Sequence, residues 1–389
     1  MIHAEKDIIL SINAETGDPM TVSDGRRTVN IVPFGGTAES AFFKGRVLPA
    51  AVDTQTCTEG GCELSARYML EGSDCTGADC RIFIENNGTS VDGKTLTKPV
   101  IVTDSRALGW LNGAELTGEV TGTDNGVRVD ISEKTEGFVR EEHFFGAGGE
   151  DIIFADLYIP ESIVKNGGKC PVVIYSHGFN SSSWQVRDTA ERIAAHGIGV
   201  YCLDFRGGCN DSKSTGSTLD MSIESEQRDL LGAIEDVKKL EWADSERIYL
   251  VGESQGGLVT ALTAPLPCEP PKGIFLIYPA FCIPGDWEWA VKNENALASP
   301  VEFNGMMIGR AYVDGLPRYD VFAKAAEYKG RAVIFHGEND SVVAVEHSRR
   351  LKDCYDNAEL YVYPGQDHGF EDNYKTITAS IIAREINNG

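Results

Sequence analysis

The chain has 389 residues, of which 42% are hydrophobic and 24% are charged, a composition typical of a globular protein and unlike that of a disordered or collagen-like chain. Its 35 Lys and Arg residues stand against 59 Asp and Glu residues, and the formal net charge is -24. Both parts of the chain on either side of residue 135 are acidic, so neither offers the basic surface that a nucleic-acid backbone requires, and we expect no nucleic acid as a partner.

The start of the chain, MIHAEKDIIL, has no basic segment, long apolar run or small-residue cleavage site of the kind that marks a signal peptide. No stretch approaches the roughly 18 apolar residues of a membrane-spanning helix. We therefore expect a cytoplasmic protein that does not enter a membrane, with a secreted protein as the alternative if a signal peptide once preceded this start. The ten cysteines are too sparse for a disulfide scaffold, and we expect most of them to be buried thiols.

The first 135 residues contain short runs in which apolar residues alternate, such as Ile8–Ile12, Ala66–Leu70 and Arg81–Ile84. Turn-forming dipeptides separate such runs, namely Asp24-Gly25, Asn87-Gly88, Asp92-Gly93 and Asn125-Gly126. This pattern is typical of β-hairpins in a sheet or a small barrel. We therefore expect an all-β, barrel-like domain over residues 1–135.

Four cysteines of this domain form two pairs with four residues between the partners, Cys57 with Cys62 and Cys75 with Cys80. Zinc sites tolerate spacings of this kind, so zinc is one alternative. We favour reduced thiols or local disulfides in adjacent hairpins. The sequence leaves the redox state of the four residues open.

Residues 136–389 form the second predicted domain, in which strands alternate with helices from Asp151 onward. The predicted strands are mostly continuous apolar runs, namely Ile152–Ile159, Val172–Tyr175, Val200–Asp204, Ile248–Val251, Ile274–Tyr278, Ala332–His336 and Leu360–Tyr363. Helices are predicted between them at Ser183–His196, followed by Gly197 as a helix-ending glycine, and at Ser222–Leu240, with Ser222 as its cap. Strands covered on both faces by helices indicate a mostly parallel α/β sheet.

The strongest chemical signal is the segment Gly252-Glu253-Ser254-Gln255-Gly256-Gly257, which lies between a predicted strand and an apolar helical segment. Small residues at 252 and 256 allow a sharp turn from strand to helix, and that turn exposes the hydroxyl of Ser254. Five such letters can match by chance, but the strand-turn-helix context favours a nucleophile. We therefore predict Ser254 to be the catalytic nucleophile.

A serine hydroxyl needs a base to take its proton and an acid to orient that base. Asp340 follows the predicted strand Ala332–His336, and His368 follows Leu360–Tyr363, in the order Ser, acid, His that such folds use. We therefore predict Asp340 as the acid and His368 as the base. Their rivals are Glu338, a carboxylate in the same loop, and His347, which we expect on the surface of the helix Val345–Cys354.

The oxyanion that forms during acyl transfer needs backbone N–H donors. The residue after the nucleophile, Gln255, and Phe179 in the loop after Val172–Tyr175 are the expected donors. His177 in that loop is expected to support the loop rather than to act as a base. Cys209 lies in another loop on the same expected face, but without a neighbouring base it is a weak nucleophile candidate.

Taken together, YSHGFN at 175–180, DFRGG at 204–208, GESQGG at 252–257, HGENDSVV at 336–343 and DHGF at 367–370 resemble the α/β-hydrolase superfamily. Within it the chain most resembles the bacterial feruloyl (cinnamoyl) esterases, from which it departs at Glu253, where many of them carry His. The resemblance implies a lid insertion at about residues 281–319. Its aromatic residues Trp287, Trp289 and Tyr312 would then contact a planar acyl group. The alternative is that they pack the core of the insertion itself.

The N-terminal residues resemble a second family. GGTAESAFFKGRVLPAAVDTQ at 35–55, ARYMLEG at 66–72 and RIFIENNG at 81–88 are similar to a small bacterial β-barrel family of unknown function. This resemblance implies a barrel and no chemistry.

The residues predict a serine carboxylesterase. The resemblance implies that it hydrolyses hydroxycinnamate esters, such as those derived from plant cell walls. The alternatives are a peptidase or acylaminoacyl hydrolase, a general short-chain esterase, and a protein whose barrel serves mainly for binding or assembly. No P-loop, dinucleotide fingerprint, HExxH or EF-hand loop is present, so we expect no cofactor and no metal. The sequence leaves open whether the chain forms a homo-oligomer.

Overall fold

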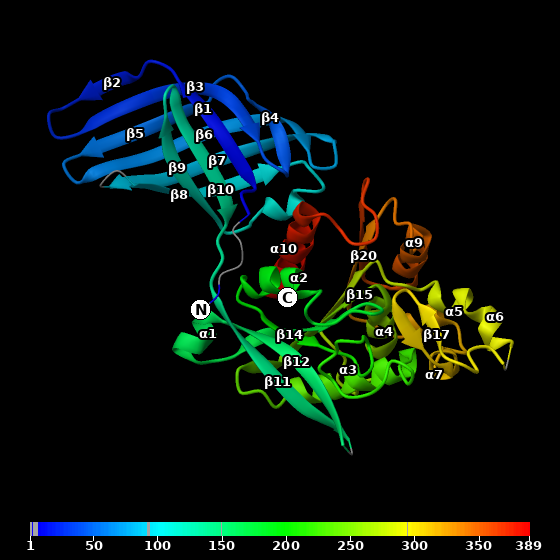
Figure 1. Ribbon diagram of the computed structural model, residues 1–389. Coiled ribbons are helices and arrows are strands. Elements are labelled where there is room, and N and C mark those ends of the chain that lie inside the picture. The colour runs from blue at the N-terminus through cyan, green and yellow to red at the C-terminus, as the bar shows by residue number, and fades with distance from the viewer. Residues whose placement is uncertain (1, 3–6, 92–93, 149, 294) are drawn as a thin grey trace. The chain divides into compact units, whose positions relative to one another are not determined.

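The computed structural model describes residues 2, 7–91, 94–148, 150–293 and 295–389 (Figure 1). The chain folds into two compact units, of which the N-terminal one spans Glu5–Thr135. The C-terminal unit spans Glu136–Gly389 and also includes Ile2, which forms a β-bridge with Phe138. Each unit has its own large sheet.

The N-terminal unit is a closed antiparallel β-barrel. Its strands are β1 (Leu10–Thr16), β2 (Met20–Ser23), β3 (Thr28–Glu39), β4 (Phe43–Val47), β5 (Val52–Thr58), β6 (Gly61–Asp74), β7 (Asp79–Val91), β8 (Lys94–Thr103), β9 (Leu116–Thr123) and β10 (Gly126–Glu133). The barrel closes because β1 pairs with β10 along one edge and with β3 along the other. A short 3₁₀ helix, Gly109–Leu111, follows β8. The predicted barrel-like domain is confirmed.

The predicted turns of the barrel differ in their outcome. Asp24-Gly25 lies between β2 and β3, and Asn125-Gly126 lies at the turn from β9 into β10, of which Gly126 is the first residue. The φ angle is +85° at Gly25 and +157° at Gly126. Asn87-Gly88 was predicted to be a turn, and this was wrong because both residues lie inside β7, paired with β6 and β8. A Cβ at Gly88 would lie 2.3 Å from the carbonyl oxygen of Leu96, so this glycine serves close strand packing. Asp92-Gly93 lies outside the described residues.

The two cysteine pairs of the barrel differ in their bonding. Cys57 and Cys62 face each other across β5 and β6 and form a disulfide, whereas Cys80 is a buried thiol. One of the two favoured outcomes, a local disulfide, therefore holds for Cys57 and Cys62. The alternative of a zinc site made of all four sulfurs is wrong, because sulfurs bonded to each other cannot serve as thiolate ligands.

The C-terminal unit is built on a sheet with the strand order β11-β12-β14-β13-β15-β16-β19-β20. These strands are β11 (Phe138–Gly148), β12 (Asp151–Pro160), β13 (Cys170–Ser176), β14 (Gly199–Leu203), β15 (Ala243–Glu253), β16 (Gly273–Ile277), β19 (Arg331–Gly337) and β20 (Ala358–Tyr363). From β14 to β20 neighbouring strands are parallel, and β12 pairs antiparallel with β11 and with β14. The mostly parallel sheet and its predicted strands are confirmed.

Helices cover both faces of this sheet (Figure 1). They are α1 (Glu161–Asn166), α2 (Arg187–Ala194), α3 (Ile223–Val237), α4 (Ser254–Thr263), α5 (Ile283–Asp286), α6 (Glu288–Val291), α7 (Arg310–Asp314), α8 (Val321–Ala325), α9 (Val345–Cys354) and α10 (Asp372–Asn388). Among the described residues, no helix combines the length and the apolar character needed to cross a bilayer.

Two elements of this unit differ clearly from the prediction. The helix predicted from Ser183 begins only at Arg187, because Ser183 is held outside it: its N–H donates to Asp204 and its hydroxyl donates to Asp156. β11 was not predicted as a strand, since charged residues interrupt its apolar pattern and it is an edge strand. The predicted cap at Ser222 is confirmed, since its hydroxyl accepts from the N–H of Ser225 at 3.1 Å. The other helix ends earlier than predicted: its C-cap is Ala195, and Gly197, with a φ of +78°, lies two residues beyond.

The predicted site residues lie at the edge of the sheet where the parallel strands have their carboxyl ends. In a parallel α/β sheet, ligands bind beyond the carboxyl ends of the strands. The loops after β13, β15, β19 and β20 all begin at this edge, and they carry the predicted site residues. An insertion between β16 and β19 contributes α5, α6, α7 and a small hairpin of β17 (Val301–Phe303) and β18 (Met306–Ile308).

Candidate active site

Ser254 lies at the junction of β15 and α4, on the sharp turn that its flanking glycines permit. Its φ is +50°, a left-handed conformation that is costly for a residue with a side chain and is typical of functional sites. A Cβ at Gly252 would lie 2.4 Å from the carbonyl oxygen of Gly256, and a Cβ at Gly256 would lie 2.3 Å from that of His177. Only glycine fits at either position, so these two residues allow the turn that presents the Ser254 hydroxyl.

This packing gives a first prediction. Gly256→Ala is expected to lower the free energy of unfolding by about 2 kcal/mol, because overpacking against backbone atoms cannot be relieved by rotating a side chain. Gly285→Ala is the matched control, since a Cβ at Gly285 would meet nothing within 4 Å. Urea unfolding of both variants measures the difference. Equal stability of the two would contradict the close packing at Gly256.

His368 lies between Ser254 and Asp340 and contacts both. Its Nε2 is 3.1 Å from Oγ of Ser254, and its Nδ1 is 2.8 Å from Oδ2 of Asp340. Because the carboxylate can only accept, Nδ1 carries the proton, which leaves the lone pair of Nε2 directed at the serine hydroxyl. This arrangement can withdraw a proton from Ser254 and return it to a leaving group.

Asp340 is fixed on every side. Its side chain is 0% exposed, and its Oδ1 accepts from the N–H groups of Val342 at 2.9 Å and Val343 at 2.8 Å. Burial alone would raise the pKa of this carboxyl, but hydrogen bonds from His336, His368 and the backbone outweigh burial and hold the pKa well below its usual value. Asp340 therefore remains charged when it orients His368.

The loop after β13 approaches the nucleophile closely. A Cβ at Gly178 would lie 3.3 Å from Cβ of Ser254, which places the neighbouring Phe179 at the same pocket. Gln255 is in the first turn of α4, where N–H groups have no acceptor within the helix. The residues Phe179 and Gln255 therefore lie beside Ser254, where an oxyanion would need backbone N–H donors.

His177 supports this loop rather than the reaction. Its Nδ1 is 2.8 Å from the carbonyl oxygen of Gly178, to which it donates, and its Nε2 accepts from the N–H of Phe205 at 3.1 Å. Burial lowers the pKa of His177, which keeps the ring neutral and able to accept. The structure thus agrees with the loop-supporting role expected for this histidine.

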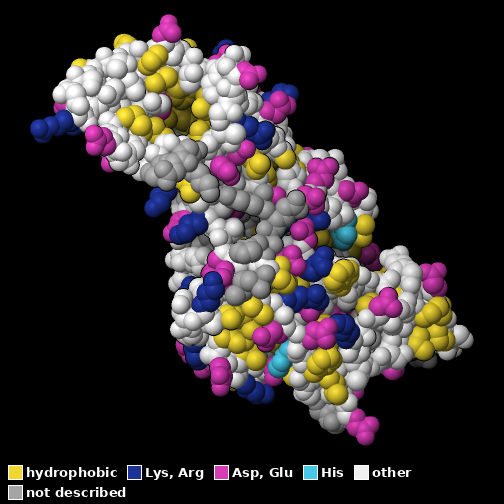
Figure 2. Space-filling model, turned by 60° about the vertical axis from the view of Figure 1, so that its left-hand side comes forward, with side chains coloured by type: hydrophobic (Ala, Val, Ile, Leu, Met, Phe, Trp, Pro, Cys, Tyr) yellow, Lys and Arg dark blue, Asp and Glu magenta, His cyan; other side chains and the backbone are white. Residues whose placement is uncertain are grey.

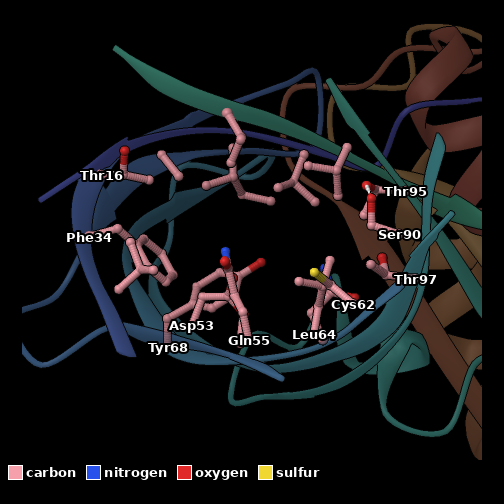
Figure 3. A pocket seen from close by; sticks show the side chains of 18 residues that line it. Thr16, Phe34, Asp53, Gln55, Cys62, Leu64, Tyr68, Ser90, Thr95 and Thr97 are labelled. Carbon is pink, nitrogen blue, oxygen red and sulfur yellow. Dashed lines mark hydrogen bonds between the residues drawn. The ribbon is translucent and has the colours of Figure 1, made fainter. Parts of the chain in front are cut away.

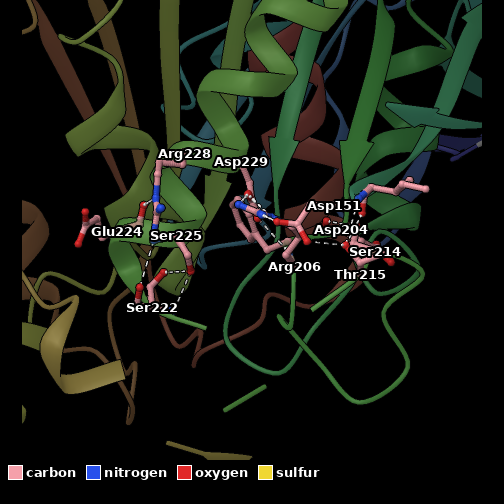
Figure 4. Close-up of polar contacts among 12 residues, drawn as sticks. Asp151, Asp204, Arg206, Ser214, Thr215, Ser222, Glu224, Ser225, Arg228 and Asp229 are labelled. Atoms are coloured by element: carbon pink, nitrogen blue, oxygen red, sulfur yellow. Dashed lines mark hydrogen bonds and ion pairs between the residues drawn. The ribbon is translucent and has the colours of Figure 1, made fainter. Parts of the chain in front are cut away.

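The DFRGG segment is braced by α3 (Figure 4). Arg206 donates through Nε to Oδ1 of Asp229 at 2.7 Å and through its backbone N–H to Oδ2 at 2.9 Å, and it also pairs with Asp151. Asp204 accepts the N–H of Lys213 at 3.0 Å. These contacts fix the position of Phe205, and through it the ring of His177.

Two residues near the histidine were not predicted as parts of the site. The ring of Tyr278 lies against that of His368, with 4.4 Å between the ring centroids. Glu253 accepts hydrogen bonds from the hydroxyls of Tyr175 and Tyr278. Burial raises the pKa of Glu253 despite these two bonds. The departure at Glu253 was noted in the sequence, but its link to His368 through Tyr278 depends on the fold.

A pocket of about 900 Å³ opens at Ser254 and His368. The insertion supplies much of its wall, and the aromatic residues lining it are Phe179, Tyr278, Trp287, Trp289, Phe303 and Tyr312. Among the described residues that line it, none is Lys or Arg. The pocket therefore offers no cation to an anionic ligand, and its aromatic wall suits a molecule with a planar or apolar body.

The three predicted contact residues lie in different settings. Tyr312 is 1% exposed and donates to Oε1 of Gln255 at 2.9 Å, whereas Trp289 is 58% exposed. The ring centroids of Trp287 and Tyr312 are 5.2 Å apart, and those of Trp287 and Phe303 are 5.1 Å apart. These aromatic residues therefore pack against one another and also line the pocket, so both readings of the insertion apply.

The rival residues lie elsewhere. Glu338 is exposed, and its N–H donates to the carbonyl oxygen of Tyr363. His347 lies in α9, half-buried rather than exposed as expected, with its ring parallel to that of Phe322 at 6.4 Å. Burial raises the pKa of the Cys209 thiol, which makes it a poor nucleophile. None of these three lines the pocket at Ser254.

Known proteins resemble the two units separately. Residues 168–305 match the model of a family described as serine aminopeptidase, S33. Residues 6–134 match a family described as a protein of unknown function, DUF3237. The second match confirms the predicted resemblance of the barrel to a family without assigned chemistry.

Individual relatives match the C-terminal unit. A monoacylglycerol lipase of Mycolicibacterium smegmatis is 27% identical over 270 residues, which cover 59% of this chain and 90% of that protein. The structure of Est1E from Butyrivibrio proteoclasticus with ferulic acid bound is 24% identical with a TM-score of 0.56, covering 64% of this chain and 100% of that one. GrgF from Penicillium sp. sh18, an α/β hydrolase, is 18% identical with a TM-score of 0.50, covering 64% of this chain and 97% of that one. At such identities the two solved structures show a shared fold.

Proposed function

Because the C-terminal unit of this chain belongs to the α/β-hydrolase superfamily, we propose that the protein is a serine hydrolase of carboxylic esters. The observation that carries this proposal is the continuous hydrogen-bonded series from Ser254 through His368 to Asp340, which lies at a pocket with an aromatic wall. The superfamily and a lipase relative make the chain a hydrolase with ester hydrolysis as the favoured chemistry. The roles of the individual residues are part of the proposal.

The proposed reaction has two halves. Ser254 attacks the ester carbonyl while Nε2 of His368 takes its proton, and the N–H groups of Phe179 and Gln255 stabilise the oxyanion. His368 then gives the proton to the departing alcohol, which leaves an acyl group on Ser254. Water attacks this acyl-enzyme with His368 again as the base, and the carboxylic acid is released.

For the acyl group we propose a hydroxycinnamate of the feruloyl type. Trp287, Trp289 and Tyr312 are the proposed contacts, because aromatic pairs add about 0.5 to 1.5 kcal/mol beyond the burial of area. The ferulic acid in the related Est1E structure supports this choice. The insertion that carries these residues is proposed to act as a lid over the acyl group.

Two other substrate classes have support. The lipase relative favours a monoacylglycerol with an aliphatic chain, and the description of the matched family favours an aminoacyl amide. An amide has a poorer leaving group than an ester. The aromatic wall of the pocket favours the planar ester over both.

Turnover of esters with one common alcohol tests the acyl preference. We expect kcat/KM for methyl ferulate to exceed that for methyl acetate and methyl laurate by at least about tenfold, and alanine anilide to be a poor substrate. Trp289→Leu should lower the value for methyl ferulate about fivefold and leave that for methyl acetate unchanged, since acetate is too short to reach the indole. If methyl acetate or methyl laurate is the better substrate, the feruloyl assignment is wrong and only the esterase assignment stands.

A further inference from the structure

The barrel encloses a cavity of about 270 Å³ that no part of the proposed ester hydrolysis uses. Side chains from many of its strands point into this space (Figure 3), and Figure 2 shows a hollow in the barrel unit lined by apolar side chains. An engineered protein cavity of about 150 Å³ holds benzene. The barrel cavity therefore has room for a single ring with substituents.

Four polar atoms of the cavity wall have no hydrogen-bond partner among the residues that the structure describes. They are Oδ1 of Asp53, the hydroxyl of Tyr68, Oδ1 of Asn86 and Oγ1 of Thr97. Three of these side chains are more than nine-tenths buried, with exposed fractions of 6% for Tyr68, 4% for Asn86 and 5% for Thr97. A buried polar group without a partner costs about 1 to 3 kcal/mol, and natural proteins leave few of them. Four such atoms around one cavity indicate a missing hydrogen-bonding molecule.

Other polar groups of the wall are already satisfied. Nε2 of Gln55 donates to Oδ2 of Asp53 at 2.8 Å, and the hydroxyl of Thr95 donates to that of Ser90 at 2.9 Å. The unpartnered atoms are therefore a subset that the barrel does not pair internally. They also sit on different strands, β5, β6, β7 and β8, so they surround the space rather than lie along one wall.

The chemistry of the wall defines the ligand. Carbonyl and carboxylate oxygens of Asn86 and Asp53 can only accept, so the ligand must donate hydrogen bonds. Burial raises the pKa of the Tyr68 hydroxyl, which stays protonated and can donate as well as accept. A ligand hydroxyl also does both and so can pair with Tyr68 and Thr97 in either direction.

Charge excludes another class of ligand. The carboxylate of Asp53 lies in the wall, and among the described lining residues there is no Lys, Arg or His to balance an anion. The remaining wall is largely apolar, with Ile12, Val32, Phe34 and Val129 among its members. An acid that is ionised at neutral pH would be repelled and left unpaired there.

We propose that the barrel is a binding site for a small neutral alcohol or phenol with a body about the size of one ring, held by Asp53, Tyr68, Asn86 and Thr97. The ring lies among the apolar side chains, and its hydroxyl groups donate to Asp53 and Asn86. This gives the N-terminal unit a ligand of its own. The proposal is independent of the ester hydrolysis, because binding and turnover are measured separately.

Calorimetric titration of the full chain tests this proposal with 4-hydroxybenzyl alcohol as the probe. We expect saturable binding of the alcohol and binding at least tenfold weaker for 4-hydroxybenzoate, which has the same ring and an anionic group. Tyr68→Phe should weaken binding of the alcohol about three- to tenfold, the effect of removing one hydrogen bond. It should not lower the melting temperature, because it removes a buried hydroxyl that has no partner in the free protein.

Tyr158→Phe is the matched control. Tyr158 also carries a buried hydroxyl without a partner, but it lies in β12 of the C-terminal unit. This variant should bind the alcohol as the parent does, and both variants should keep turnover of methyl ferulate. No saturable binding up to about 10 mM, equal affinity for the benzoate, or unchanged affinity in Tyr68→Phe would each overturn the proposal. In the last case the probe binds elsewhere, and in the first the cavity holds only water.

Discussion

Ser254→Ala is expected to lower kcat for ester hydrolysis by a factor on the order of 10⁴ or more. The reason is the position of its hydroxyl, 3.1 Å from Nε2 of His368, on a turn that holds it in a left-handed conformation. Without this oxygen no acyl-enzyme can form, and the oxyanion donors and the pocket alone supply only the residual rate. KM should change little, because the pocket wall remains intact.

Initial rates with methyl ferulate, together with a thermal melt of the variant, measure this effect. Ser299→Ala in the exposed part of the insertion is the control and should keep the parent rate. A variant at 254 that retains more than about 1% of the parent kcat while folding normally would show that the nucleophile lies elsewhere.

Asp340→Asn is expected to have the second largest effect, a loss in kcat of about 10⁴-fold. An asparagine at this position keeps the shape but can present an N–H to Nδ1 of His368, which favours the tautomer with its proton on Nε2. That tautomer cannot accept the proton of Ser254. Hydrogen bonds hold the pKa of Asp340 below its usual value, so above the ordinary carboxyl range its charge does not vary with pH.

Glu338→Gln removes the other carboxylate of the same loop and serves as the control. Glu338 is exposed and does not line the pocket, so this variant should retain the parent kcat within about twofold. Parallel kcat measurements at pH 7 compare the two substitutions. A larger loss for Glu338→Gln than for Asp340→Asn would reverse the roles assigned to the two carboxylates.

The sequence predicts the positions of Ser254, Asp340 and His368 well because each follows an apolar strand. Once the strands are parallel, the loops after them must meet at one edge of the sheet, whatever the distance along the chain. The same reasoning does not reach Tyr278, which touches His368 through a packing of side chains 90 residues apart. No local pattern marks such a contact.

Local patterns also fail where glycine has more than one use. Asn87-Gly88 has the letters of a hairpin turn, yet Gly88 lies within β7 because the neighbouring strand leaves no room for a side chain. β11 was missed for a related reason: an edge strand has one neighbour and tolerates the charged residues Arg140, Glu141 and Glu142. Alternation reveals which side of a strand is buried only when the buried side is apolar.

The barrel shows the limit of that rule most clearly. Ile82, Ile84 and Asn86 alternate along β7 and all are buried, so a polar residue occupies an inward position. From the sequence alone this asparagine belongs with the residues around a turn. Its inward orientation, and the lack of a partner for its side-chain oxygen, depend on closure of the barrel.

The acidic side chains at the mouth of the aromatic pocket have a consequence for the end of the catalytic cycle. In the proposed reaction an ester enters uncharged and its acid leaves as an anion. Asp286 and Glu302 line the space, and none of the described lining residues is Lys or Arg. Cleavage thus creates repulsion where there was none, and this speeds departure of the acid. Product inhibition by free hydroxycinnamate should be weak, and weaker still at low ionic strength.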